Sequence, residues 1–120
     1  MTVGRRIREL RRAKGLTQRE LASLVRLDHT YVSKIENDRL PYTPAATTLE
    51  ALAKALDADE LELLALANKL PSGMRAAAGT PEARAFFRRT AGLVKSPQQW
   101  QALLQTIEEE LDAEGEESDQ

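Results

Sequence analysis

Apolar side chains recur every three or four residues along most of the chain, and no run alternates apolar and polar positions. Spacing of three and four places side chains on one face of an α-helix, whereas alternation is typical of a half-buried strand. The pattern therefore predicts an all-α protein. The first helix is predicted from about Val3 to Ala13, with Ile7 and Leu10 on its buried face, and Gly15 provides the turn that ends it.

Two short helices with a tight turn between them come next. Thr17 and Glu20 have the spacing of a capping box, which predicts a helix that begins there and ends near Val25. Asp28 is the next candidate N-cap, and the helix after it extends to Glu36. Two short helices joined by a short turn form a helix-turn-helix.

Two further helices complete the N-terminal half. A loop that contains two prolines separates them from the helix-turn-helix, and they are predicted over residues 45–56 and 59–68. In the second of them, helical spacing places Leu61 and Leu64 in the core and Leu63 on another face.

Composition divides the chain into four segments. The five helices form a domain over residues 1–70, and residues 71–81, rich in Gly, Pro and Ala, are predicted to be a linker with room for one short helix. Two more helices are predicted within residues 82–112, introduced by a Thr-Pro and a Ser-Pro pair. Residues 113–120 contain no large apolar side chain and are predicted to be a disordered acidic tail.

Charge is distributed unevenly along the chain, whose net charge is -2. Residues 1–54 contain 11 Lys or Arg and 6 Asp or Glu, a net of +5, whereas residues 55–120 contain 6 and 13, a net of -7. A basic half predicts a polyanionic partner, because neutralising phosphates releases counterions. A solvated, arginine-rich helix surface would give the same count.

Several classes of function are excluded by what the chain lacks. It has no cysteine and a single histidine, so we expect no metal site. No nucleophile, base and orienting group fall together, and no glycine-rich loop is suited to phosphate, so we expect neither an enzyme nor a cofactor. No apolar run reaches the roughly 18 residues of a membrane span. We therefore expect a cytoplasmic protein without a membrane partner.

Three separated blocks of sequence agree in spacing and residue type with one known domain. They are Gly-Leu-Thr-Gln-Arg-Glu-Leu-Ala at 15–22, Tyr-Val-Ser-Lys-Ile-Glu-Asn at 31–37 and Leu-Glu-Ala-Leu-Ala-Lys-Ala-Leu at 49–56. Together they resemble the XRE-type helix-turn-helix domain of phage-repressor-like regulators, over about residues 3–68. The resemblance implies a five-helix, lambda-repressor-like fold. In such domains the third helix enters the major groove of DNA and the second lies across the backbone.

The third helix carries the candidate base-reading side chains. With Val32 and Ile35 directed inward, a polar set remains on the outer face, namely His29, Thr30, Ser33 and Lys34. A lysine can donate to guanine O6 and N7, and hydroxyls can reach base edges or phosphates. The resemblance implies contacts to the DNA backbone from Gln18, Asn37 and Arg39. To these we add Thr17 and Tyr31, whose hydroxyl would lie near a phosphate while its ring packs at the core or its rim. For each of these side chains, a solvated surface residue is the alternative.

The resemblance also implies a structural ion pair and two departures from the usual pattern. Glu36 matches the position that pairs with an arginine of the first helix, here Arg11. Arg26 stands in the turn where glycine is usual, which predicts either a non-glycine residue at positive φ or an altered turn. The proline-containing loop over residues 40–48 is longer than usual.

The C-terminal helices carry more apolar surface than a two-helix hairpin can bury. The residues concerned are Phe86, Phe87, Trp100, Leu103, Leu104, Ile107 and Leu111. One recognition helix reads only about four or five base pairs, so useful specificity normally needs two copies. We therefore predict a C-terminal segment of two to three helices that forms a symmetric dimer interface. Packing of these side chains back on the N-terminal domain is the alternative.

Three functions fit these observations. We predict a sequence-specific homodimeric repressor that binds a palindromic operator in double-stranded DNA. The first alternative is the antitoxin of a toxin-antitoxin pair, whose C-terminal segment binds a protein partner. The second is a protein-interaction scaffold that does not bind DNA. The polar face of the third helix and the basic half of the chain argue against the scaffold.

Overall fold

The computed structural model describes residues 1–118 and confirms an all-helical protein, with no strand in this range. None of the described helices is long and apolar enough to span a membrane. Residues 1–77 form one compact unit, and a second begins at residue 78. The described helices are α1 (Val3–Ala13), α2 (Gln18–Val25), α3 (His29–Glu36), α4 (Ala46–Ala55), α5 (Glu60–Leu66), α6 (Ser72–Ala77), α7 (Pro81–Leu93) and α8 (Pro97–Ser118).

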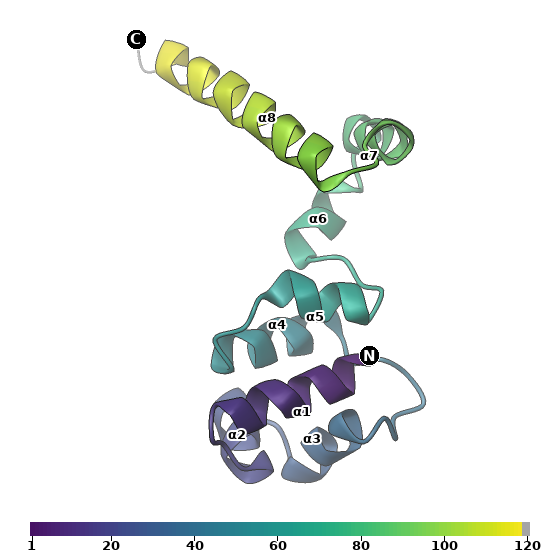
Figure 1. Ribbon diagram of the computed structural model, residues 1–120, viewed down its shortest axis with the longest axis vertical. Helices are drawn as coiled ribbons and strands as arrows, with labels where there is room; N and C mark the ends of the chain where they lie inside the picture. The colour runs from purple at the N-terminus through teal and green to yellow at the C-terminus, as the bar shows by residue number, and fades with distance from the viewer. Residues whose placement is uncertain (119–120) are drawn as a thin grey trace. The chain divides into compact units, whose positions relative to one another are not determined.

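Helices α1 to α5 share one hydrophobic core in the first unit. Figure 1 shows α1 between the α2–α3 pair and the α4–α5 pair, and α1 packs against both α3 and α5. The largest fully buried apolar side chains come from all five helices: Ile7, Leu21, Val32, Leu49, Leu52, Leu63 and Leu64. Because α3 packs on both α1 and α2, this core determines which face of α3 remains outside.

Helices α1 and α3 approach each other closely at Gly4. A Cβ atom on Gly4 would lie 2.1 Å from the Ile35 carbonyl oxygen, so a side chain there would force the two backbones apart. The Thr2 hydroxyl accepts from the Arg5 amide at 3.1 Å and donates to Asp38 at 3.0 Å. The start of α1 therefore holds the C-terminal end of α3.

The turn between α2 and α3 contains a non-glycine residue in the left-handed region. Arg26 has φ 58° and ψ 40°, which is one of the two outcomes that the sequence left open. The amide of Leu27 closes the turn on the Ala22 carbonyl at 2.9 Å. A left-handed conformation costs an L-residue roughly 1 kcal/mol or more.

Replacing Arg26 by glycine is expected to stabilise the protein by up to about 1 kcal/mol. Glycine adopts positive φ without strain, although its more flexible unfolded chain offsets part of the gain. Urea denaturation of Arg26→Gly and wild type measures the difference. Arg26→Ala is the control, because it shortens the side chain and keeps the strain. A glycine variant less stable than the alanine variant would contradict the argument.

The buried face of α5 differs from the predicted one. Leu63 is fully buried and Leu61 is 54% exposed, the reverse of the expected arrangement, whereas Leu64 is buried as expected. The leucines of this seven-residue helix lie on several faces, so spacing alone could not select one. Packing of α5 against both α1 and α4 selects the face that contains Leu63.

The boundary between the two units lies inside the predicted linker, and α6 occupies most of that segment. The amide of Ser72 donates to the Glu50 carboxylate at 3.1 Å, which ties the start of α6 to α4. The ordered part of the first unit thus extends past residue 70, where the N-terminal domain was predicted to end.

The second unit consists of α7 and α8. The Thr80 hydroxyl accepts from the Ala83 amide at 3.3 Å and begins α7, and the Ser96 hydroxyl accepts from the Gln99 amide at 3.1 Å and begins α8. Among residues 78–115, no side chain is buried. As a single copy, this unit has no core of its own.

The end of α8 differs from the predicted disordered tail over residues 113–120. The helix continues to Ser118, so the prediction was wrong for residues 113–118, and residues 119–120 lie outside the described part of the chain. The absence of large apolar side chains suggested disorder. Alanine and glutamate nevertheless have high helix propensity, and no proline interrupts the helix.

Candidate nucleic-acid interface

The outer face of α3 presents the four predicted base-reading side chains. Val32, Ile35 and Glu36 are buried, and they determine which side of the helix faces inward. On the other side, three of the four are exposed and Ser33 is half-buried; the exposed ones are His29, Thr30 and Lys34. This face combines hydrogen-bond donors and acceptors on a helix of eight residues.

Asp28 begins α3 and carries a negative charge beside this face. Its carboxylate accepts from the Thr30 amide at 2.8 Å, and this hydrogen bond lowers the pKa of Asp28. The His29 ring also lies nearby, with 3.9 Å between its Nδ1 and the Asp28 carboxylate. Because the pKa is lowered in the folded state, the cap stabilises the protein at neutral pH. That contribution is lost only as the pH falls through the pKa of the folded state.

The N-terminus of α2 is closed by a complete capping box. The Thr17 hydroxyl accepts from the Glu20 amide, and the Glu20 carboxylate accepts from the Thr17 amide, each at 3.1 Å. Thr17 therefore already holds the helix end, although it was predicted to contact the DNA backbone. The amides of the first turn beyond it are the donors that a helix N-terminus offers to an anion.

A buried polar network joins α1, α2 and α3 behind the outer face. Arg11 donates to Glu36 through Nε at 2.7 Å and Nη2 at 2.8 Å, and through Nη1 to the Leu16 carbonyl at 2.8 Å. Arg11 is 8% exposed and Glu36 2% exposed. The hydrogen bonds to Glu36 raise the pKa of Arg11, which stays charged. The structure thus contains the ion pair that the resemblance implied.

Gln18 belongs to the same network. Its side-chain amide donates to Glu36 at 3.2 Å, so one of its two N–H groups is directed inward. The sequence assigned this side chain to the DNA backbone. Its position shows that it also links the first residue of α2 to the last residue of α3.

The other predicted backbone contacts lie at the C-terminal end of α3 and just after it. The side-chain Nδ2 of Asn37 donates to the Ser33 carbonyl at 2.8 Å and so caps the helix, whereas Arg39 is exposed. Tyr31 is half-buried; its burial, and secondly the nearby Tyr42, raise its pKa. The Tyr31 phenol therefore remains a protonated donor at neutral pH.

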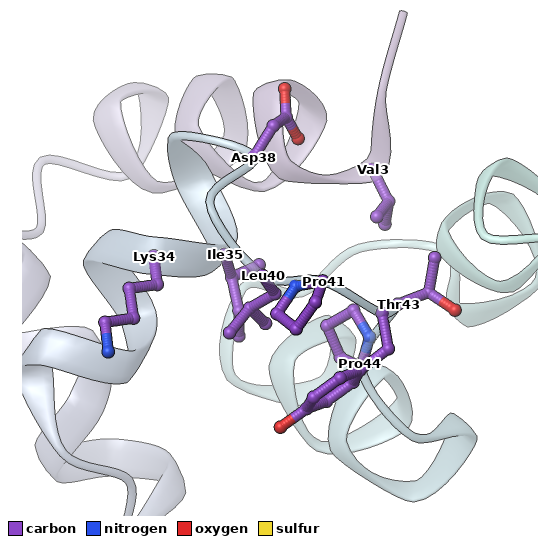
Figure 2. Close-up of a pocket in the computed structure, with 9 residues that line it drawn as sticks. Val3, Lys34, Ile35, Asp38, Leu40, Pro41, Thr43 and Pro44 are labelled. Carbon is purple, nitrogen blue, oxygen red and sulfur yellow. The ribbon is translucent and has the colours of Figure 1, made fainter.

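Sequence reasoning missed a hollow of about 300 Å³ beside Lys34, formed by the loop after α3. Figure 2 shows Lys34 on one side of it and Pro41 and Pro44 of the loop on the other. The two prolines lie only three residues apart and restrict the backbone of this loop. They were the one feature of the sequence that indicated a fixed loop beside α3. The lining residues are Val3, Lys34, Ile35, Asp38, Leu40, Pro41, Tyr42, Thr43 and Pro44.

Comparison with known proteins decides the family. Residues 2–66 match the family model described as a helix-turn-helix domain. The chain belongs to the XRE-type helix-turn-helix family. The described α2, turn and α3 lie within the matched residues, so the helix-turn-helix motif and its supporting helices α1, α4 and α5 are the part that this family shares.

This XRE-type chain is similar over part of its length to proteins that are named as a repressor and a transcriptional regulator. It is 48% identical over 56 residues to the immunity repressor protein of Bacillus phage phi105, a match that covers 47% of this chain and 38% of the repressor. It is 37% identical over 73 residues to the uncharacterized HTH-type transcriptional regulator y4dJ of Sinorhizobium fredii, covering 61% of this chain and 92% of that protein. A solved structure, the restriction-modification controller protein C.AhdI from Aeromonas hydrophila, is 43% identical and has a TM-score of 0.47. That match covers 51% of this chain and 89% of C.AhdI.

Proposed function

We propose that this chain is a homodimeric transcriptional repressor that binds a palindromic operator in double-stranded DNA through α3. The observation that carries the proposal is the exposed polar face of α3 on a helix whose other side is locked to α1 and α2 by Glu36 and its partners. A rigidly supported helix can enter the major groove without reorganisation.

The four side chains of this face suit direct readout of bases. Lys34 is a donor for guanine O6 and N7, and the Thr30 methyl group can contact a thymine methyl. Ser33 and His29 add groups that both donate and accept. Because major-groove patterns differ for every base pair, this set supports recognition of a defined sequence.

Contacts to the DNA backbone would come from the start of α2 and the end of α3. The amides of the first α2 turn, Arg39 and the Tyr31 phenol are the available donors. The net charge of +5 over residues 1–54 supports the same partner. Binding through these groups should weaken as the salt concentration rises.

Repression and two-fold symmetry rest on two further observations. The related protein of phage phi105 is an immunity repressor, 48% identical over 56 residues. The second unit has no buried side chain and exposes Phe86, Trp100, Leu104 and Leu111, which a second copy would cover. A symmetric dimer requires half-sites about one helical turn apart.

Selection from random DNA duplexes by the purified protein at fixed salt tests this proposal. We expect an enriched inverted repeat with half-sites about 10 base pairs apart. Weak, salt-sensitive binding without an enriched sequence would contradict the proposal and favour a scaffold. Enrichment only after addition of a co-purifying protein would favour an antitoxin that requires its partner.

Replacing Lys34 by alanine is expected to cost about 1 to 3 kcal/mol of binding free energy per half-site on the enriched duplex, because a base contact is lost. Fluorescence anisotropy titrations on this duplex and on a scrambled one measure the loss. Lys54→Ala removes an exposed lysine of α4 and serves as the control. An equal loss on both duplexes would reassign Lys34 to a phosphate contact.

A further inference from the structure

The charges of the second unit are separated by helix. Helix α7 carries three arginines and one glutamate, whereas α8 carries seven Asp or Glu and no Lys or Arg. Among the described residues between 82 and 114, no charged side chain belongs to a salt bridge. The second unit therefore presents two complementary, unneutralised sets of charges.

Both sets flank apolar side chains. On α7, Arg84 and Arg88 lie one turn apart beside the half-buried Phe87, and Arg89 lies on the far side of the same apolar face. On α8, Glu110 and Glu114 lie one turn apart. Glu110 occupies one edge of the stripe that contains Leu103, Ile107 and Leu111, and Glu108 occupies the other edge. Glu114 continues the stripe itself, one turn beyond Leu111. An apolar centre with a charged rim is the usual composition of a protein interface.

The carboxylates of α8 oppose the stability of that helix. Glu108 and Asp112, and likewise Glu110 and Glu114, are four residues apart, and like charges at this spacing repel. They lie in the C-terminal half of α8, where the helix dipole is negative, and the last turn contains no basic residue. A basic surface against this end of α8 would offset both the repulsion between the carboxylates and their unfavourable interaction with the helix dipole.

We propose that a second copy of the chain supplies this surface, with the α7 arginines of each copy paired with the α8 carboxylates of the other. The inference rests on the homodimer proposed above and specifies how it is held. One chain forms no ion pair between its own α7 and α8 in the described residues, whereas a two-fold axis makes the α7–α8 contact twice. The flanking charges then set the orientation of the two copies, as they do in coiled coils.

Charge exchange between copies provides the test. One variant combines Arg84→Glu, Arg88→Glu and Arg89→Glu, and the other combines Glu108→Lys, Glu110→Lys and Glu114→Lys. In the first variant both helices are acidic. In the second, the three exchanged positions of α8 carry the same sign of charge as the α7 arginines, so each variant should repel a copy of itself at the paired positions. In a mixture, both α7–α8 contacts again join opposite charges. The control replaces three exposed arginines of the first unit by glutamate: Arg5, Arg12 and Arg19.

Sedimentation velocity on the full-length proteins gives the readout. We expect dimers for wild type and control, monomers for each exchange variant alone and dimers for their equimolar mixture. The dimer dissociation constant of wild type should rise about tenfold or more between 50 and 500 mM NaCl. Exchange variants that stay dimeric, or a mixture that stays monomeric, would overturn the charge pairing. A monomeric wild type would instead overturn the homodimer of the proposed function.

Discussion

Glu36→Ala is expected to lower the free energy of unfolding by about 3 to 5 kcal/mol, because it leaves the buried Arg11 guanidinium without its counter-charge. Glu36 accepts two hydrogen bonds from Arg11 and one from Gln18, and Arg11 would keep only the Leu16 carbonyl. Small domains have total stabilities of only about 5 to 15 kcal/mol, so the loss is a large fraction. Urea denaturation followed by circular dichroism measures it.

Two companion variants show whether the unpaired charge causes the loss. Replacing both partners, as Arg11→Met with Glu36→Leu, removes the buried charge and should recover much of the stability. Glu62→Ala breaks the exposed ion pair with Arg6 and should change stability little. A double variant less stable than Glu36→Ala would show that the network stabilises the fold beyond satisfying Arg11.

Ending the chain after Ala77 is expected to abolish dimerisation and to weaken binding to the selected operator by about 100-fold or more. The two DNA-binding first units would no longer be linked, and linkage of two binding modules can by itself strengthen binding by about 10² to 10⁴-fold. We choose Ala77 because α6 belongs to the first unit and is tied to Glu50. Sedimentation velocity and anisotropy titration at fixed salt give the two readouts.

The truncated protein should keep the thermal stability of the first unit, because every buried side chain among the described residues lies before Ala77. Circular dichroism melting curves provide this control. A truncated protein that remains folded and dimeric, and that binds the operator as wild type does, would place the dimer interface in the first unit instead.

Helix starts and the outer face of α3 could be predicted from local sequence. The caps at Thr17, Asp28 and Asp59 involve hydrogen bonds to amides two or three residues away, so the sequence alone contains both partners. The face of α3 is equally local. Val32 and Ile35 are its apolar residues, and they leave the polar ones outside.

Contacts between segments far apart in the chain could not be predicted in this way. Spacing within α5 did not distinguish Leu61 from Leu63, since α1 and α4 select the buried face. The need for glycine at position 4 becomes visible only when the Ile35 carbonyl lies against α1. The inward hydrogen bond of Gln18 depends in the same way on Glu36, 18 residues later.

The sequence by itself determined the all-α class, the helix-turn-helix and the polar face of α3, because these depend on residues within one or two helical turns. The tertiary structure decided how Arg11, Gln18 and Glu36 meet behind that face, and where the loop after α3 forms a hollow beside Lys34. It also showed that α7 and α8 bury no side chain in a single copy. Burial and long-range hydrogen bonds depend on which helices become neighbours, and that arrangement is a property of the whole core.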